Sequence, residues 1–231
     1  NLKQLNLNAI SIGQTAARLI QLGEAKDAIR FLNLAIRLNP KEEHLWLILA
    51  DAQIKTEDIS SASISLDKAI SLNPRKTSAW LVKASISMQQ KNPKNAIIYI
   101  KKAMEIDSKM PKGYFQLGNA YFMLKELNMA LKAFKKASEL KPKFWQALNN
   151  KALVLYELGK PQAAIKEWNK ILEITNNAEP MLALAAALHQ SNNEIDKSIK
   201  LAKQALTNDP NYVSRLYQKE QLWGEKLQQA T

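Results

Sequence analysis

The chain has 231 residues, 46% of them hydrophobic, and a formal net charge of +12. This length and hydrophobic content suffice to bury a sizeable core, which excludes a disordered chain and a disulfide-stapled mini-domain. The absence of cysteine excludes disulfides, thiolate catalysis and cysteine-ligated zinc. The longest purely apolar run, "MLALAAAL" at 181–188, is far shorter than the roughly 20 residues that cross a bilayer.

Prolines mark a regular spacing along the chain. Pro40, Pro74, Pro142 and Pro210 are separated by 34 residues or by twice 34. A fixed period of this length is typical of stacked repeats. After a lead-in at residues 1–8, the period predicts that residues 9–210 form six repeats. These are 9–42, 43–76, 77–110, 111–144, 145–178 and 179–210.

Small residues recur within the predicted repeats. The eighth, twentieth and twenty-seventh positions carry alanine or glycine in sixteen of eighteen cases, as at Ala16, Ala28 and Ala35 of the first repeat. Small side chains let two antiparallel helices approach to the short end of the usual separation of about 8–10 Å. Each repeat should therefore hold one helix over about its first fourteen residues, a short turn, and a second helix.

The fourth repeat carries the fullest version of the pattern. Its key residues are Tyr114, Leu117, Gly118, Tyr121, Ala130, Phe134, Ala137 and Pro142. The pattern resembles the tetratricopeptide repeat over residues 9 to 210. The resemblance implies an all-α fold, a right-handed solenoid of about twelve antiparallel helices. Lys83 and Lys151 replace a usual leucine and His189 a usual tyrosine, so we expect looser packing there, with His189 in the core.

Residues 211–231 are expected to form a C-terminal capping helix that hides the open face of the last repeat. In it Leu216, Leu222, Trp223 and Leu227 would cover the repeat while charged residues face water. The run "QKEQLWGEKL" at 218–227 is similar to the tail of tetratricopeptide proteins from cyanobacteria and plastids. Some of those proteins are thought to help assemble photosynthetic membrane complexes, which suggests such a role here.

The sequence lacks the usual components of catalytic and metal sites. Its two histidines, His44 and His189, lie four repeats apart, and repeats of a solenoid contact only their neighbours. No phosphate-binding glycine loop, paired-histidine zinc motif or calcium loop occurs in the sequence. We therefore expect no enzyme activity, no metal site and no cofactor.

A partner-binding groove follows from the resemblance. In the family, positions two, five, six, nine, twelve and thirteen of each repeat line the concave face, and we call these the groove positions. The candidates chosen from them are Leu47, Asp51, Ile54, Leu81, Ser85, Met88, Phe115, Gln116, Asn119, Phe122, Asn150 and Tyr156. An uncovered apolar strip with polar neighbours suits a peptide or an amphipathic helix of a partner. For any single apolar residue, packing against the adjacent helix is the alternative.

Some relatives hold a carboxylate in this groove with a clamp of lysine, arginine and asparagine. Asn119 and Asn150 match two positions of that clamp. Phe115, Pro180 and Leu184 replace its cations, so we expect no clamp for a partner's C-terminal carboxylates.

Much of the positive charge falls on outward positions of the second helices. The candidate residues are Lys101, Lys102, Lys132, Lys135, Lys136, Lys166, Lys170, Lys200 and Lys203. Such a basic convex face could meet anionic lipid head groups or nucleic-acid phosphates, or it could be simply solvated. No RNA-reading motif favours nucleic acid.

We therefore expect a non-catalytic protein–protein interaction scaffold, which resides in the cytoplasm or peripherally on a membrane surface such as the thylakoid. Its narrower role would be assembly of a photosynthetic membrane complex. Nucleic-acid or anionic-membrane binding through the basic convex face is one alternative, and a self-assembling structural protein is another. The sequence identifies neither the partner nor the oligomeric state.

Overall fold

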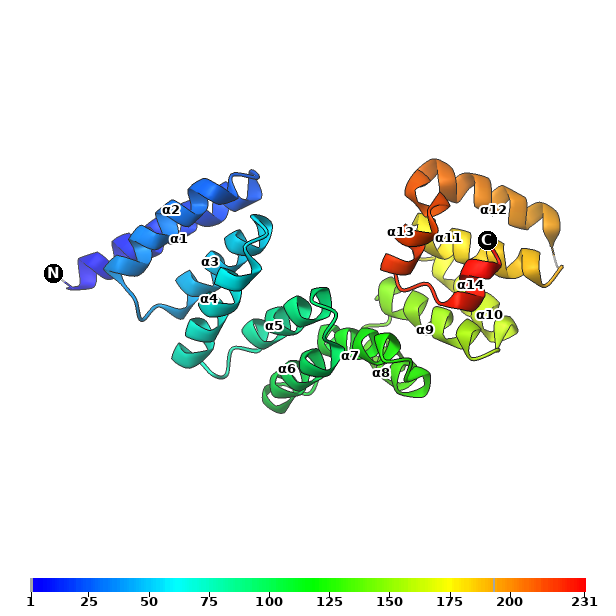
Figure 1. Ribbon diagram of the computed structural model, residues 1–231, viewed down its shortest axis with the longest axis horizontal. Helices are drawn as coiled ribbons and strands as arrows, with labels where there is room; N and C mark the ends of the chain where they lie inside the picture. The colour runs from blue at the N-terminus through cyan, green and yellow to red at the C-terminus, as the bar shows by residue number, and fades with distance from the viewer. Residues whose placement is uncertain (1, 193) are drawn as a thin grey trace. The chain divides into compact units, whose positions relative to one another are not determined.

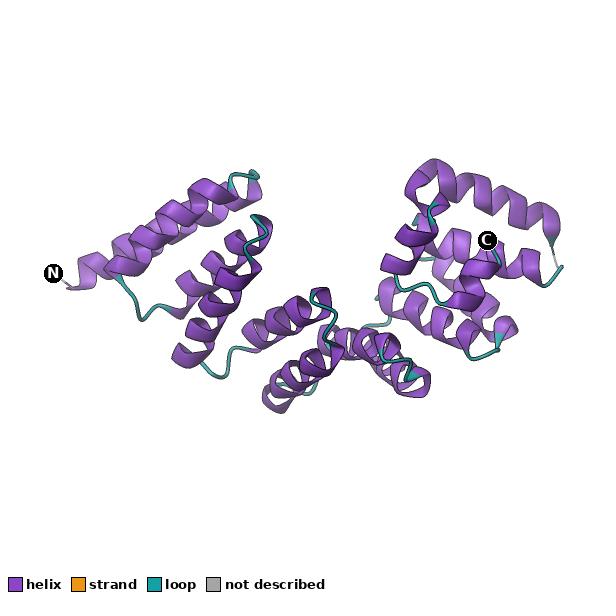
Figure 2. Ribbon diagram, in the orientation of Figure 1, coloured by secondary structure: helices purple, strands orange, loops and turns teal. Residues whose placement is uncertain are grey.

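The computed structural model describes residues 2–192 and 194–231. Among these residues every regular element is a helix and there is no strand, as Figures 1 and 2 show, so the predicted all-α fold is confirmed. The chain divides into two compact units, an N-terminal unit Asn1–Ser108 and a C-terminal unit Lys109–Thr231.

The N-terminal unit contains three helix pairs. They are α1 (Leu2–Gln21) with α2 (Ala25–Leu38), α3 (Glu43–Lys55) with α4 (Ile59–Leu72), and α5 (Thr77–Gln89) with α6 (Pro93–Ile106). Helix α2 also contacts α3, and α4 contacts α5, so the pairs stack in chain order. The predicted lead-in is different in the structure: residues 2–8 already belong to α1, because "LKQLNLN" contains neither proline nor glycine to break a helix.

The C-terminal unit contains three further pairs. They are α7 (Pro111–Met123) with α8 (Leu127–Leu140), α9 (Trp145–Glu157) with α10 (Pro161–Leu172), and α11 (Ala178–Gln190) with α12 (Ile195–Asn208). Helix α8 contacts α9, and α10 contacts α11. The first helix of each pair we call its A helix and the second its B helix.

A tail of residues 210–231 follows α12. It forms the 3₁₀ helix η1 (Pro210–Val213) and two short helices, α13 (Arg215–Glu220) and α14 (Glu225–Gln229). The prediction of one capping helix over 211–231 is therefore wrong. Leu222 adopts a left-handed conformation with φ 63°, and Gly224 is extended, so the chain turns between α13 and α14.

Small residues hold each helix pair together. All eighteen positions that the 34-residue pattern singled out are buried, including the two occupied by Ile171 and Ser198. At Gly118 the fit is closest, because a Cβ added there would lie 2.5 Å from Cε1 of the fully buried Phe134. The period thus reflects contacts that leave no room for larger side chains.

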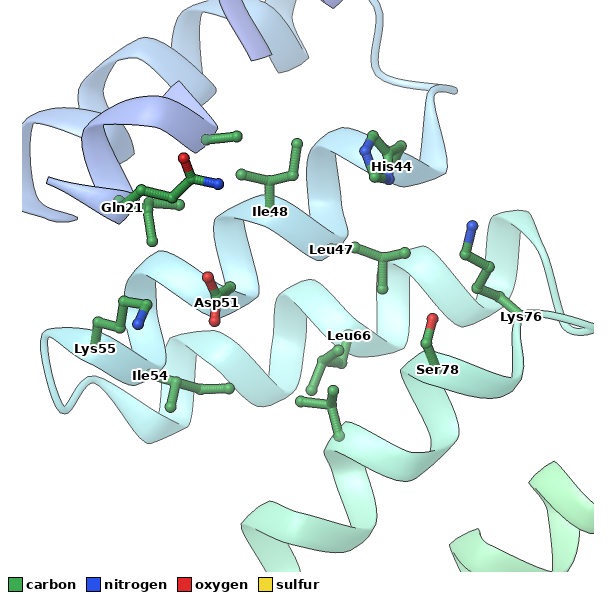
Figure 3. Close-up of a pocket in the computed structure, with 13 residues that line it drawn as sticks. Gln21, His44, Leu47, Ile48, Asp51, Ile54, Lys55, Leu66, Lys76 and Ser78 are labelled. Atoms are coloured by element: carbon green, nitrogen blue, oxygen red, sulfur yellow. The ribbon is translucent and has the colours of Figure 1, made fainter. Parts of the chain in front are cut away.

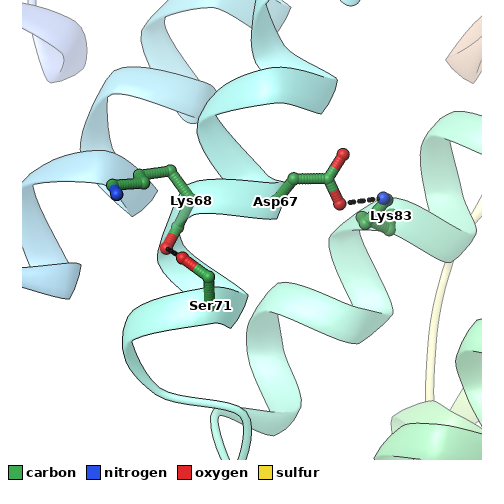
Figure 4. Close-up of polar contacts among 4 residues, drawn as sticks. All are labelled: Asp67, Lys68, Ser71 and Lys83. Carbon is green, nitrogen blue, oxygen red and sulfur yellow. Dashed lines mark hydrogen bonds and ion pairs between the residues drawn. The ribbon is translucent and has the colours of Figure 1, made fainter.

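The departures from the repeat pattern are compensated rather than loosely packed. The ammonium of Lys83, on α5, pairs with Asp67 of α4 (Figure 4). It also lies 4.9 Å from the centre of the Tyr99 ring. Lys151 pairs likewise with Glu167 at 2.7 Å. His189, in contrast, is exposed instead of lying in the core, because it belongs to the last repeat of the array.

Turns between A and B helices share one backbone feature. The fifteenth position of the first five repeats has a positive φ, at Gly23, Glu57, Lys91, Lys125 and Gly159. Three of these residues have a Cβ that disfavours this left-handed conformation.

We predict that Gly118→Ala destabilises the C-terminal unit by about 1–3 kcal/mol, because the added methyl group would displace the ring of Phe134. Urea unfolding followed by circular dichroism measures the change. Gly13→Ala is the matched control, since its Cβ would lie close to one terminal methyl carbon of Leu45, whereas that of Gly118→Ala would meet three ring atoms of Phe134 at 2.5–2.8 Å. An equal loss in both variants would contradict the explanation.

We predict that Lys91→Gly raises the free energy of unfolding of the N-terminal unit by on the order of 0.5–1 kcal/mol, because glycine relieves the left-handed strain at φ 56°. Lys101→Gly, inside helix α6, should instead destabilise by about 1 kcal/mol. Thermal unfolding of both variants tests the sign. A loss of stability in Lys91→Gly would refute the prediction.

Candidate functional site

A cleft of about 470 Å³ opens on the A helices of the N-terminal unit. Its walls come from α1, α3 and α5, with Leu66 of α4 and Lys76 of the following turn completing them (Figure 3). The other lining residues all occupy groove positions. The six from the second repeat, every groove position that it has, are His44, Leu47, Ile48, Asp51, Ile54 and Lys55.

The cleft combines apolar and polar side chains. Leu66 lies near its middle, with Leu47 on one side and Ile54 on the other (Figure 3). His44 and Lys76 lie toward the Leu47 side and Asp51 and Lys55 toward the Ile54 side. Lys76 forms an ion pair with Glu43 at 3.3 Å. The arrangement can take up apolar side chains and hydrogen-bond the polar groups that flank them.

The structure brings only some of the predicted groove residues into this cleft. Leu47, Asp51 and Ile54 line it, with Leu47 and Ile54 half-buried and Asp51 exposed. Leu81, Ser85 and Met88 lie on α5 outside its lining, and Leu81 is buried. The prediction had omitted His44, Ile48, Lys55 and Val82, although their groove positions could have identified them.

The predicted residues of α7 in the C-terminal unit are half-buried. They are Phe115, Gln116, Asn119 and Phe122. The Phe115 ring lies 5.9 Å from that of Phe134 and 5.0 Å from that of Phe144, so it contributes to packing. The Asn150 amide donates a hydrogen bond of 2.9 Å to the Asn119 side chain. These residues serve the unit's own structure at least in part.

Four of the six groove positions of each of the last two A helices are buried. On α9 these are Asn149, Asn150, Leu153 and Tyr156, and on α11 they are Pro180, Ala183, Leu184 and Ala187. The tail supplies part of the cover, since α14 contacts both α9 and α11 (Figure 1). Trp223 and Leu227 are 3% and 1% exposed and belong to the same apolar cluster as Leu153 and Leu184.

Polar contacts fasten α14 to the end of α9. The Glu157 carboxylate accepts hydrogen bonds from the backbone N–H groups of Leu227 at 3.2 Å and Lys226 at 3.4 Å. The Lys226 ammonium donates a bond of 2.7 Å to the Glu157 carbonyl. Glu157 thus caps the first turn of α14, a task usually performed by the residue before a helix. Gly224 permits the contact, because a Cβ there would lie 2.2 Å from Cδ of Glu157.

A carboxyl group is buried beside this tail. Burial raises the pKa of Glu179, the second residue of α11, to about 7, although the side chains of Asn149 and Trp223 lie near enough to favour its charged form. The Asn149 amide nitrogen and the Trp223 indole nitrogen are both buried and make no hydrogen bond within the described residues. Glu179 was not among the site residues predicted from the sequence, where no pattern distinguishes it from the other acidic residues.

The nine candidate lysines of the basic face are all exposed, on α6, α8, α10 and α12. Lys102 pairs with Glu105 and Lys136 with Glu139, each three residues along the same helix. Exposed pairs of this kind contribute little to stability.

Two findings concern other kinds of site. In residues 2–192 and 194–231 no group of three or more potential ligands among histidine, cysteine, aspartate and glutamate is placed to hold a metal ion. No helix among the described residues is long and apolar enough to cross a membrane.

Three models described as tetratricopeptide repeat match the chain at residues 19–86, 77–110 and 111–144. Together they span residues 19–144, more than half of its length. No curated protein matches the sequence.

Solved structures share the fold at low sequence identity. Pseudomonas aeruginosa PilF has a TM-score of 0.79 and 18% identity, covering 94% of this chain and 98% of PilF. MamA from Desulfovibrio magneticus RS-1 has a TM-score of 0.65 and 20% identity, with 72% and 94% covered. YrrB, described as a TPR protein with an unusual peptide-binding site, has a TM-score of 0.61 and 18% identity, with 82% and 97% covered. At these identities the likeness establishes the fold alone.

We predict that the C-terminal unit loses stability as pH rises from about 4.5 to 7. In this interval the unfolded chain releases the Glu179 proton while the folded chain retains it, and above pH 7 the loss is complete. Glu179→Gln should remove this dependence, which is on the order of 3 kcal/mol. Urea unfolding at pH 5, 6, 7 and 8 tests it, with the exposed Glu173→Gln as control. Identical pH profiles for wild type and Glu179→Gln would refute it.

Proposed function

This chain is a member of the tetratricopeptide repeat family, and on that premise we propose that it is a non-catalytic scaffold that holds a segment of a partner protein in the cleft of its N-terminal unit. One observation carries the proposal: every groove position of the second repeat lines that one cleft. Protein–protein interaction is typical of the family, and YrrB, which shares the fold, is described as having a peptide-binding site.

The chemistry of the cleft indicates which segment it takes. Its volume of about 470 Å³ lies within the usual range for ligand pockets, about 300–1,000 Å³. Leu47, Ile54 and Val82 offer contact to apolar side chains, while Asp51 and Gln21 can hydrogen-bond a backbone. A peptide or amphipathic helix with two or three apolar residues and polar flanks fits this surface best.

We predict that a peptide selected for binding from a display library loses at least tenfold in affinity for the Leu47→Glu, Ile54→Glu double variant. The two carboxylates would replace apolar side chains that contact the ligand with charged groups. Asp51→Lys, at an exposed position, should also weaken binding without affecting folding. Fluorescence anisotropy measures the affinities, after circular dichroism has established that each variant is folded.

The control variant is Leu34→Glu, which changes a half-exposed leucine on α2 that does not line the cleft. Unchanged affinity in all cleft variants would reject the cleft as the binding site.

One narrower role and two alternative functions were also expected from the sequence. Assembly of a photosynthetic membrane complex, in the cytoplasm or at a membrane surface, is a more specific version of the scaffold proposal and stays a prediction. The nine exposed lysines support binding to an anionic surface as a second candidate function. That function requires an affinity that falls steeply with salt and is lost when Lys132, Lys135 and Lys136 are changed to glutamate. Self-assembly requires a solution mass above 26.1 kDa.

A further inference from the structure

The groove positions are open in one unit of this protein and largely covered in the other. In the N-terminal unit those of the second repeat line an open cleft. In the C-terminal unit four of the six groove positions on each of α9 and α11 are buried, and the chain's own tail contacts both helices. The tail therefore occupies the kind of surface on which a repeat protein binds a partner segment.

We propose that residues 222–230 are an internal ligand of the C-terminal unit. They occupy a second segment-binding surface, formed by α9 and α11, and they leave it when a partner segment with the same recognition features competes. Those features are a tryptophan, a glycine directly after it, and a leucine four residues beyond the tryptophan, at the start of a helical turn.

Each recognition feature has a counterpart on the surface. Trp223 and Leu227 are buried in the apolar cluster that includes Leu153, Tyr156 and Leu184. The Glu157 carboxylate, at a groove position, accepts the backbone N–H groups of Lys226 and Leu227. Backbone donors are present in any peptide, so this contact fixes the place of the helical turn, and the two apolar side chains select the sequence.

Gly224 is the most selective feature. A Cβ at this position would lie 2.2–2.5 Å from three atoms of the Glu157 side chain. Its φ of −76° is accessible to any residue, so space and not backbone conformation favours glycine here. A larger residue would force the Glu157 side chain to shift and would disturb its bonds to the N–H groups of Lys226 and Leu227, so a competing segment with glycine after its tryptophan fits best.

The tail covers the open side of the last repeat only in part. Tyr212, Val213 and Gln218 of the tail line a pocket of about 380 Å³ there together with Leu182 of α11 and Ile199 of α12, and Ala230 reaches the same pocket. Ile199, Val213 and Leu216 are 45%, 72% and 68% exposed. Trp223 and Leu227 lie over the A helices instead, where a ligand is expected.

Two features of the bound tail favour its release. Leu222, directly before Trp223, adopts a left-handed conformation that is strained for a residue with a branched side chain. Helices α13 and α14 have only six and five residues, too few to persist alone.

The internal ligand lies in the C-terminal unit and goes beyond the proposed function, which concerns the cleft of the N-terminal unit. The experiments below leave that cleft unchanged. A negative result in these experiments would reject the internal-ligand proposal. It would leave the proposed function of the N-terminal cleft, which the Leu47 and Ile54 variants test, standing.

Hydrogen exchange of the wild-type full chain is the first test, because it needs no substitution. If the tail opens locally, amides of residues 225–230 exchange at least about 100-fold faster than those of Leu153 and its neighbours in α9. Equal protection of the two segments would overturn the proposal, since the tail would then open only when the unit unfolds.

Competition is the second test, with a fluorescein-labelled peptide of residues 217–231 as probe. Full-chain Gly224→Val, in which the added side chain displaces the tail, should bind the peptide at least tenfold more tightly than wild type. The same peptide with Trp223→Ala should not bind. The matched control is full-chain Glu220→Gln, which changes an exposed residue of α13 outside residues 222–230 and should behave as wild type.

The remaining outcomes are decisive as well. A folded Gly224→Val chain that does not bind the peptide would overturn the proposal. If Gly224→Val does not fold, the wild-type exchange measurement decides alone. A wild-type mass of twice 26.1 kDa that falls to 26.1 kDa in Gly224→Val would assign the tail to a second copy and overturn the internal arrangement.

Discussion

The close approach of the A and B helices at their small residues is the constraint on which the other features of this protein depend. Ala16, Ala28 and Ala35 are fully buried in the first pair, and Gly118 leaves the space that the Phe134 ring fills. Because these contacts fix how each A helix lies against its B helix, the same positions of successive A helices face the same side. The cleft of the N-terminal unit follows from this repetition, since groove positions of α1, α3 and α5 meet in it.

Features with the 34-residue period could be predicted from the sequence, because each depends on contacts within one repeat or between neighbouring repeats. The six helix pairs and the buried small positions are of this kind. The tail could not be predicted, because it has no repeat to follow and its contacts are distant in sequence: Leu227 is 70 residues from Glu157.

One signal of the tail's contacts was present in the sequence. Gly224 interrupts a stretch predicted as helix, and a glycine there indicates close contact with another part of the chain.

Positions at which the family usually has one residue type accept other residues in this chain. Lys83 and Lys151 stand where leucine is usual, yet Asp67 and Glu167 compensate their charges. His189 stands where tyrosine is usual but is exposed, because the sixth repeat has no successor. The candidate site was predicted least well for a related reason. Family geometry identifies which positions can face a groove, but Phe115 and Tyr156 at such positions pack against rings of their own unit.

The ninth position of the repeat gives a physical reason for the two states of the groove. It is Asp51 in the second repeat, whose cleft is open, but Leu153 and Ala187 in the fifth and sixth, where the tail lies. A charged residue keeps a surface hydrated, because covering it without a partner costs its hydration. Leucine at the same place in the fifth repeat favours a cover, since burial of apolar area contributes about 25 cal/mol per Å². Alanine is compatible with either state, because Ala17 occupies the ninth position of the first repeat and lines the open cleft. Glu179 opposes this gain, because the tail also helps to bury its carboxyl group. The tail is therefore held by two apolar side chains and a helix cap against a buried acid, a balance that a competing segment can shift.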